Sequence, residues 1–127
     1  MEETERMKKI LIVDDAAVIR DLVERSLGRD DCEILKAENA EEAVAIARQE
    51  KPDLIMMDIM MPGAFDGLEA TRMLKNDPQT SDCIVILLTA KGQKTDIEKG
   101  IQAGADDYFV KPFSPLELMR KVDDLLG

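Results

Sequence analysis

The 127-residue sequence contains no histidine and only two cysteines. The absence of histidine excludes a Ser-His-Asp triad, a zinc site with histidine ligands and a phosphohistidine in this chain. The cysteines, Cys32 and Cys83, show neither the spacing of a disulfide framework nor that of a redox pair. We expect each to be a small apolar core residue at the start of a strand.

The sequence also lacks long apolar runs and an excess of positive charge. No run approaches the roughly 20 residues of a membrane span. No apolar segment follows the charged N-terminus, MEETERMKK, as it would in a secretory signal. The net charge of −10 would be repelled by the phosphate backbone of a nucleic acid. We therefore expect a cytoplasmic protein that binds neither membrane nor nucleic acid directly.

Length and composition fit a single domain. The chain is 45% hydrophobic, which is enough to fill one core, and 35% charged, which favours solubility. Residues 1–6 are predicted to be a flexible tail and residues 7–127 the domain. No output domain is expected within this sequence.

Short apolar runs alternate with amphipathic segments along the domain. Several runs are continuous, which is typical of parallel strands that are covered on both faces. Five repeats of strand and helix, joined by right-handed crossovers, predict a three-layer α/β fold with a doubly wound parallel sheet. The arrangement is flavodoxin-like, with strand order 2-1-3-4-5. The strands are predicted around residues 10–13, 34–35, 54–57, 84–88 and 108–110.

Capping and breaking residues mark the expected helix ends. Gly28 closes a first helix, whose apolar stripe includes Val18. Asn39 caps a second, and a third spans residues 68–74. Capping boxes that begin at Thr95 and Ser114 predict the last two helices, near 95–103 and 114–126.

Carboxylates stand where two of the predicted strands end. Asp14 and Asp15 follow the first strand, and the four apolar residues 54–57 run directly into Asp58, with no lysine or arginine beside it. In this strand order the two ends meet at the topological switch point, where open parallel sheets bind ligands. Three adjacent carboxylates need a cation, and Mg²⁺ is the natural one.

A hydroxyl and an ammonium complete this predicted site. Thr89 follows the fourth strand and Lys111 follows the fifth. The combined set favours phosphoryl chemistry, in which a carboxylate attacks phosphorus and becomes an acyl phosphate. Each residue alone has an ordinary structural interpretation, such as a helix cap, a turn or a solvated lysine. Their joint occurrence at four strand ends supports the functional interpretation.

Four segments resemble the signature of the receiver domain of bacterial two-component response regulators: LIVDD, DLIMMDIMMPG, LLTA and GADDYFVKPF. The resemblance covers residues 7 to 127. It implies that an aspartate accepts a phosphoryl group from the phosphohistidine of a sensor histidine kinase or from a phosphotransfer protein. The domain would then signal to a downstream target or to an output domain. It would catalyse only its own phosphorylation and dephosphorylation, without acting as an enzyme on other substrates.

The resemblance also assigns the metal site and the phosphoacceptor. It implies that Asp58 is the phosphoacceptor and a metal ligand. Asp15 would bind Mg²⁺, or Mn²⁺ or another divalent ion in its place, directly, whereas Asp14 would act through water. The backbone carbonyl of Met60 would complete the protein ligands.

The remaining roles concern switching. By resemblance, Thr89 and Lys111 contact the phosphoryl group, Tyr108 is the aromatic switch residue, and the peptide bond between Lys111 and Pro112 is cis. Without the resemblance, Tyr108 would be interpreted as a strand core residue. We expect a partner-binding face formed by the helix near 95–103, the strand with Tyr108 and the last helix. A phosphorylation-dependent dimer is compatible with such a face.

One departure from the family pattern lies after Pro62. The family reaches its glycine four residues past this proline, whereas here Gly67 stands five past it. The loop at 63–66 therefore has one extra residue. Because Met60 precedes the insertion, we expect metal binding to be kept, whereas the loop shape is expected to differ.

Two alternatives remain at this point. A Mg²⁺-dependent phosphohydrolase of the haloacid-dehalogenase type also uses an aspartyl nucleophile, but it requires Asp-x-Asp directly after its first strand. Here the adjacent pair Asp14-Asp15 is followed by Ala16-Ala17, and Asp58-Ile59-Met60 lacks the second aspartate. A receiver-like interaction module that is not phosphorylated would be expected to lose acidic or lysine positions, and none is lost here.

Overall fold

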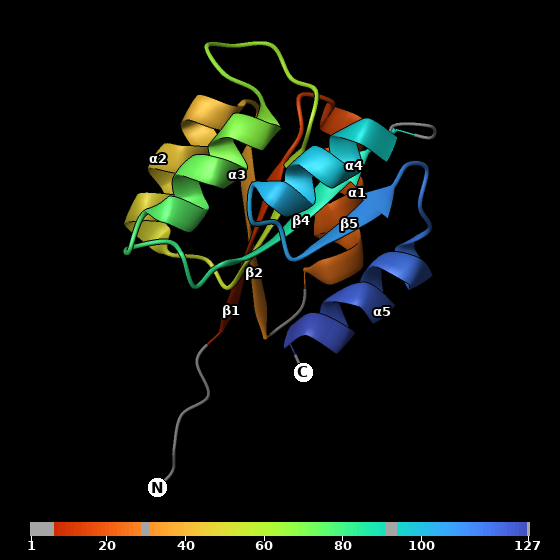
Figure 1. The fold of residues 1–127 in the computed structure, drawn as a ribbon. Helices are drawn as coiled ribbons and strands as arrows, with labels where there is room; N and C mark the ends of the chain where they lie inside the picture. The colour runs from red at the N-terminus through yellow and green to blue at the C-terminus, as the bar shows by residue number, and fades with distance from the viewer. Residues whose placement is uncertain (1–6, 29–30, 91–93, 127) are drawn as a thin grey trace, which may run out of the picture.

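The computed structural model describes residues 7–28, 31–90 and 94–126, so the predicted tail at residues 1–6 lies outside the described residues. Within these ranges five strands and five helices alternate along the chain (Figure 1). None of the described helices is both long and apolar enough to cross a membrane. The strands are β1 (Lys8–Val13), β2 (Cys32–Ala37), β3 (Leu54–Asp58), β4 (Ile84–Thr89) and β5 (Asp107–Val110). The helices are α1 (Ala17–Leu27), α2 (Ala40–Glu50), α3 (Gly67–Asn76), α4 (Lys94–Gln102) and α5 (Pro115–Leu126).

The strands form one parallel sheet in the order β2-β1-β3-β4-β5. Helices α1 and α5 pack together on one face, and α2, α3 and α4 cover the other (Figure 1). This is the doubly wound, three-layer α/β arrangement with order 2-1-3-4-5, so the predicted fold class is confirmed.

The central strand β3 explains the continuous apolar run. Leu54 and Met56 belong to the core layer beneath α1 and α5, whereas Ile55 and Met57 belong to the layer beneath α2 and α3. All four side chains are fully buried. Side chains of a strand alternate between the two faces, and here both faces are covered by helices, so no polar residue can alternate with the apolar ones. The run ends only at Asp58, where β3 reaches its carboxyl end and emerges from between the two helix layers.

Several predicted caps are present. The Asn39 side chain accepts a hydrogen bond of 2.8 Å from the Glu42 amide at the start of α2. At α5 the capping box is reciprocal, because the Glu117 amide donates to Ser114 Oγ at 3.1 Å and the Ser114 amide donates to Glu117 Oε1 at 2.9 Å. These bonds satisfy amides that a helix start leaves without partners.

Two predicted details at helix ends are wrong. α4 begins at Lys94, so Thr95 lies within its first turn and is not its capping residue. Val18 has 72% of its surface exposed, so it does not belong to the buried stripe of α1, which contains Val23 and Leu27. Gly28 does end α1, but with φ −69° it is not left-handed. A Cβ at this position would lie 2.6 Å from the Glu24 carbonyl oxygen, which explains the glycine.

Gly100 allows α4 to approach the sheet closely. It is the only buried residue described in α4, and a Cβ at this position would lie 1.9 Å from Leu87 Cδ1 of β4. The glycine thus lowers the intrinsic stability of the helix, but it also permits the close contact between α4 and β4. Few other contacts hold α4, which packs only on β4 and α3 to any extent within the described residues.

The two cysteines are free and buried, as expected. Cys32 begins β2, and Cys83 directly precedes β4. Two strands, β1 and β3, separate β2 from β4 in the sheet.

Candidate functional site

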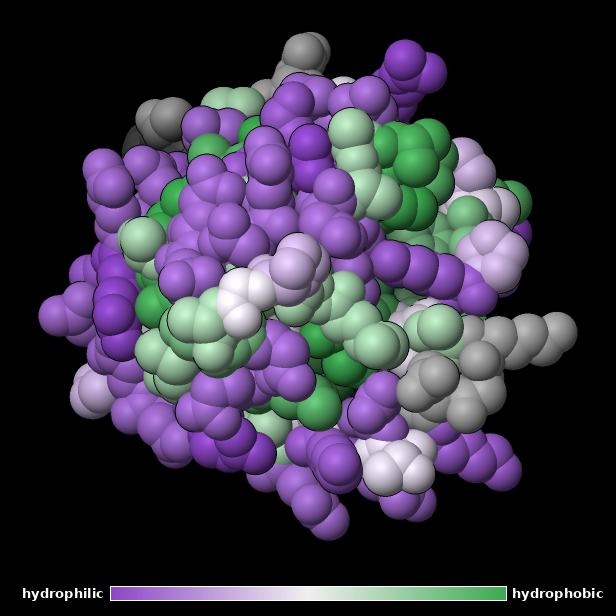
Figure 2. Space-filling view, turned by 90° about the horizontal axis from the view of Figure 1, so that it is seen from above, coloured by the Kyte–Doolittle hydropathy of each residue, from purple (hydrophilic) through white to green (hydrophobic). Residues whose placement is uncertain are grey.

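The carboxyl ends of the neighbouring strands β1 and β3 lie side by side at the topological switch point of the sheet. Val13, the last residue of β1, is paired with Met57 of β3. Asp14 and Asp58 each follow directly in sequence, so the register makes these two aspartates neighbours. This edge of the sheet is seen from above in Figure 2, where hydrophilic residues cover most of the surface and hydrophobic ones are visible between them.

Three carboxylates cluster at this edge, as the sequence predicted. One carboxylate oxygen from each of Asp14, Asp15 and Asp58 lies within 4.8 Å of the other two. Asp14 is fully buried, Asp58 is 7% exposed and Asp15 is exposed. Lys111 Nζ lies 2.7 Å from Asp14 Oδ2 and 3.5 Å from Asp58 Oδ2. Lys111 therefore pairs with two of the three clustered carboxylates, Asp14 and Asp58.

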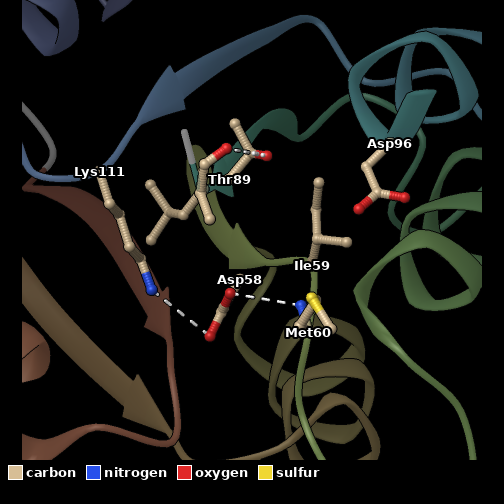
Figure 3. Close-up of a pocket in the computed structure, with 8 residues that line it drawn as sticks. Asp58, Ile59, Met60, Thr89, Asp96 and Lys111 are labelled. Carbon is tan, nitrogen blue, oxygen red and sulfur yellow. Dashed lines mark hydrogen bonds and ion pairs between the residues drawn. The ribbon is translucent and has the colours of Figure 1, made fainter. Parts of the chain in front are cut away.

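Hydrogen bonds fix both buried carboxylates. Asp14 Oδ1 accepts a bond of 2.9 Å from the Ala16 amide, while its other oxygen accepts from Lys111. The Asp14 carbonyl accepts a bond of 2.7 Å from Arg20 Nη1. Asp58 Oδ1 accepts a bond of 3.3 Å from the Met60 amide (Figure 3). The other Asp58 oxygen, Oδ2, lies beside Lys111, and Asp58 lines the cavity of the site.

The pKa values reflect this surplus of negative charge. Burial, followed by the nearby Asp14 charge, raises the pKa of Asp58 from 3.8 to about 6, against the opposing effects of Lys111 and the Met60 amide. Burial would lower the pKa of Lys111, but its hydrogen bond to Asp14 and the Asp58 charge outweigh burial and raise that pKa. The site therefore resists ionisation of Asp58 and holds Lys111 positively charged.

A cavity of about 170 Å³ opens above Asp58. Thr89 and Lys111 both line it, so the predicted hydroxyl and ammonium converge on the same space as the carboxylate (Figure 3). Thr89 is 2% exposed, and its Oγ1 donates a bond of 3.3 Å to the Ala90 carbonyl. The peptide bond between Lys111 and Pro112 is cis, as expected. The remaining lining residues are Ile59, Met60, Leu88, Ala90 and Asp96.

Asp96 was not predicted from the sequence as a site residue. It lies in the first turn of α4, and its side chain lines the same cavity as Asp58. The sequence places an acidic residue near the start of the helix that follows β4, at the edge of the sheet where the site lies. This position indicates that Asp96 could reach the site, but the sequence analysis interprets it only as part of the capping box that begins at Thr95.

Tyr108 lies outside this cavity. Its side chain is 41% exposed, so the alternative interpretation as a strand core residue is wrong. Tyr108 pairs with Leu87 and Val110 pairs with Thr89 across the parallel strands. Tyr108 therefore lies on the same face of the sheet as Thr89, two residue pairs further from the site.

The β3–α3 loop, in which an extra residue is expected from the sequence, contacts α2. The Ala64 amide donates a bond of 3.3 Å to Glu41 Oε1, and Gly63 has a φ of +138°. At the end of the loop a Cβ on Gly67 would lie 2.1 Å from the Asp58 carbonyl oxygen. Gly67 thus allows the start of α3 to lie directly against the end of β3.

Comparisons with known proteins agree with this geometry. The family model described as the response regulator receiver domain matches residues 10–123. The chain is 46% identical over 119 residues to the phosphate regulon transcriptional regulatory protein PhoB of Pseudomonas aeruginosa, covering 94% of this chain and 52% of PhoB. It is 43% identical over 121 residues to protein PilH of the same organism, covering 95% of this chain and 99% of PilH.

A solved structure gives the same result. The crystal structure of a putative response regulator from Chloroflexus aurantiacus J-10-fl superposes with a TM-score of 0.88 at 32% identity, covering 95% of this chain and 98% of that chain. The chain spans about half the length of PhoB and of the transcriptional regulatory protein ResD of Bacillus subtilis, but nearly all of PilH. From its sequence, its fold and the geometry of its site, the chain belongs to the response regulator receiver domain family.

Proposed function

We propose that this receiver domain accepts a phosphoryl group on Asp58. The observation that supports the proposal most strongly is the position of Asp58 at the base of a cavity that Thr89 and Lys111 also line, beside Asp14 and Asp15. A carboxylate nucleophile, a hydroxyl donor and an ammonium thus face one space, which is the set that transfer to an aspartate requires.

The carboxylate cluster fits a divalent metal ion. Oxygens around an octahedral Mg²⁺ at about 2.1 Å lie about 3 Å apart when adjacent and about 4.2 Å apart when opposite, and the cluster's oxygens lie within 4.8 Å of one another. Three carboxylates opposite one lysine leave an excess of negative charge that a divalent ion would offset. Asp15 and Asp58 would hold the ion directly, with the Met60 carbonyl, and Asp14 would act through water. When bound, Mg²⁺ or Mn²⁺ would neutralise charge on the transferred phosphoryl group.

The transfer itself needs little rearrangement. An Asp58 carboxylate oxygen attacks phosphorus, the P–N bond of the donor phosphohistidine breaks, and the imidazole nitrogen keeps the electron pair. Lys111 and Thr89 then donate hydrogen bonds to the phosphoryl oxygens. For this, Thr89 Oγ1 turns from the Ala90 carbonyl, whose bond at 3.3 Å is long. Water later hydrolyses the acyl phosphate, so the domain would catalyse its own phosphorylation and dephosphorylation.

The output face is proposed to comprise α4, β5 and α5. Large apolar side chains on these elements are exposed, namely Ile101, Tyr108, Val110 and Leu116. Movement of Thr89 toward the phosphoryl group would free space on the face of the sheet that Tyr108 shares, so that Tyr108 could turn inward and change this surface. A downstream protein, an output domain or a second copy of the domain would bind there. We propose a cytoplasmic location for this function, which agrees with phosphoryl donation by a kinase or phosphotransfer protein.

The other interpretations of the sequence are less favoured. Membership of the receiver family argues against a phosphohydrolase of the dehalogenase type. The presence of all acidic positions and of Lys111 at one site argues against a receiver that has lost phosphorylation.

Intact-mass analysis tests the proposal. After incubation with Mg²⁺ and acetyl phosphate, the wild-type protein should gain one phosphoryl group, whereas Asp58→Asn should gain none. Asp21→Asn is a matched control, because it removes one negative charge from an exposed position on α1. If Asp58→Asn is phosphorylated as readily as Asp21→Asn, Asp58 is not the phosphoacceptor.

A further inference from the structure

We propose that Asp96 is a positioning residue through which a phosphoryl group on Asp58 displaces the first turn of α4. The inference rests on the proposed function of Asp58 and adds a physical link from the site to α4. The Asp96 carboxylate would repel the incoming phosphoryl group across the shared cavity, and the first turn of α4 would move away from the site.

The first observation is the position of Asp96 in the cavity wall. Lys111, which follows β5, and Asp96, on α4, lie on opposite sides of the cavity that contains Asp58 (Figure 3). A phosphoryl group on Asp58 enters a space of about 170 Å³ that both side chains border. The cavity therefore has one cationic wall and one anionic wall.

The second observation concerns charge compensation. Lys111 is already paired with Asp14 and Asp58. Among the hydrogen bonds and ion pairs of residues 7–28, 31–90 and 94–126, none involves the Asp96 side chain. A phosphoryl group brings about −1.5 to −2 charges at neutral pH. Its repulsion of Asp96 would act across the shared cavity, on the side opposite the lysine.

The dipole of α4 determines how Asp96 affects the interaction between this helix and a phosphoryl group. The positive end of a helix dipole is at its N-terminus, which would attract a phosphoryl group. Asp96, in the first turn of α4, offsets this partial positive charge on the cavity side, because Asp96 lines the cavity whereas Lys94 does not. Replacement of Asp96 by asparagine should therefore convert repulsion between α4 and the phosphoryl group into weak attraction.

The weak attachment of α4 allows it to respond. Only Gly100 is buried among the described residues of this helix, whereas α3 buries four, namely Gly67, Ala70, Thr71 and Leu74. A helix with so little buried apolar surface is more easily shifted than its neighbours. A modest difference in electrostatic energy between two positions of α4 is then sufficient to change their populations.

Binding of beryllofluoride, a phosphoryl mimic, in the presence of Mg²⁺ tests this role by calorimetry. Asp96→Asn should bind the mimic about five- to tenfold more tightly than wild type. Glu98→Gln is the matched control, because it removes the same charge from an exposed position of α4 that does not line the cavity. It should change the affinity less than twofold. The gain for Asp96→Asn should shrink when salt is raised from about 0.05 M to about 0.5 M, because the repulsion is screened.

Hydrogen exchange supplies a readout that a purely structural role would not change. Mimic binding should alter protection in α4 of the wild type and of Asp96→Glu, which keeps the charge, but much less in Asp96→Asn. Equal mimic affinities for Asp96→Asn and Glu98→Gln, or an unchanged α4 response in Asp96→Asn, would overturn the inference while leaving Asp58 as phosphoacceptor. Failure of the wild type itself to bind the mimic would instead refute the proposed function on which the inference rests.

Discussion

Replacing Asp58 by asparagine should stabilise the metal-free protein at neutral pH. Asp58 is 7% exposed and lies beside Asp14, and its pKa in the folded protein is about 6, compared with 3.8 as a reference. The folded state therefore binds a proton more tightly than the unfolded state does. Stability from this group is fully present below a pH of about 3.8 and is lost as the pH rises through about 6.

The magnitude follows from the two pKa values. At about 1.4 kcal/mol per pH unit, the difference between 3.8 and about 6 corresponds to about 3 kcal/mol of destabilisation at neutral pH. An asparagine resembles the protonated carboxyl group and avoids this cost. Because it loses the attraction of Lys111 and one hydrogen-bond acceptor, we expect a gain of about 1–3 kcal/mol in the free energy of unfolding.

Urea unfolding followed by circular dichroism, in the presence of a chelator, measures this gain. Asp21→Asn is the control for an exposed aspartate. The difference between Asp58→Asn and Asp21→Asn should be large at about pH 7.5 and small at about pH 4, where Asp58 is protonated. Saturating Mg²⁺ should reduce it at about pH 7.5, because the wild type then gains stability from the ion. An equal stability of the two variants at neutral pH in chelator would refute the electrostatic account of the site.

Three further predictions concern packing, capping and the metal. Gly100→Ala should lower the free energy of unfolding by about 1–2 kcal/mol, because the added methyl group would clash with Leu87. In a Leu87→Ala background this loss should be smaller. Equal losses in both backgrounds, measured by urea denaturation, would contradict the described packing. Ser114→Ala should cost about 1 kcal/mol by removing the cap of α5, as measured in the same way, and an unchanged stability would contradict it. Asp15→Asn should weaken Mg²⁺ binding more than Asp14→Asn does in a metal titration, since Asp15 is the proposed direct ligand; equal losses would count against that assignment.

The fold and the main site could be predicted because the relevant signals are local and strong. The continuous run 54–57 indicates a central strand, and the order of strands and helices fixes which strand ends meet. Asp58 and Asp14 then converge through topology alone, since open parallel sheets bring the ends of neighbouring strands to one edge. The same reasoning placed Thr89 and Lys111 at that edge, and the structure places both in the cavity.

The features that escaped prediction depend on distances between elements. Gly100 is an unfavourable helix residue in the sequence, and only the approach of Leu87 shows why glycine is required there. The sequence pattern assigns Thr95 and Asp96 to a capping box at the start of a helix. In the structure Lys94 already belongs to α4, so both residues lie within its first turn. No local signal in the sequence reveals this shift of one residue. Val18 matches the apolar periodicity of α1, but it is exposed, and the buried residues of that helix are Val23 and Leu27.

Chemical mapping of the phosphorylated residue is the most direct test of the account. Borohydride reduces an acyl phosphate and converts the modified aspartate into homoserine, which peptide mass spectrometry locates in the sequence. After treatment with Mg²⁺ and acetyl phosphate, we predict homoserine at position 58 and none when Mg²⁺ is replaced by a chelator. Homoserine at any other aspartate, or its absence at position 58 from a protein that has gained a phosphoryl group, would contradict the assignment of Asp58 as the phosphoacceptor.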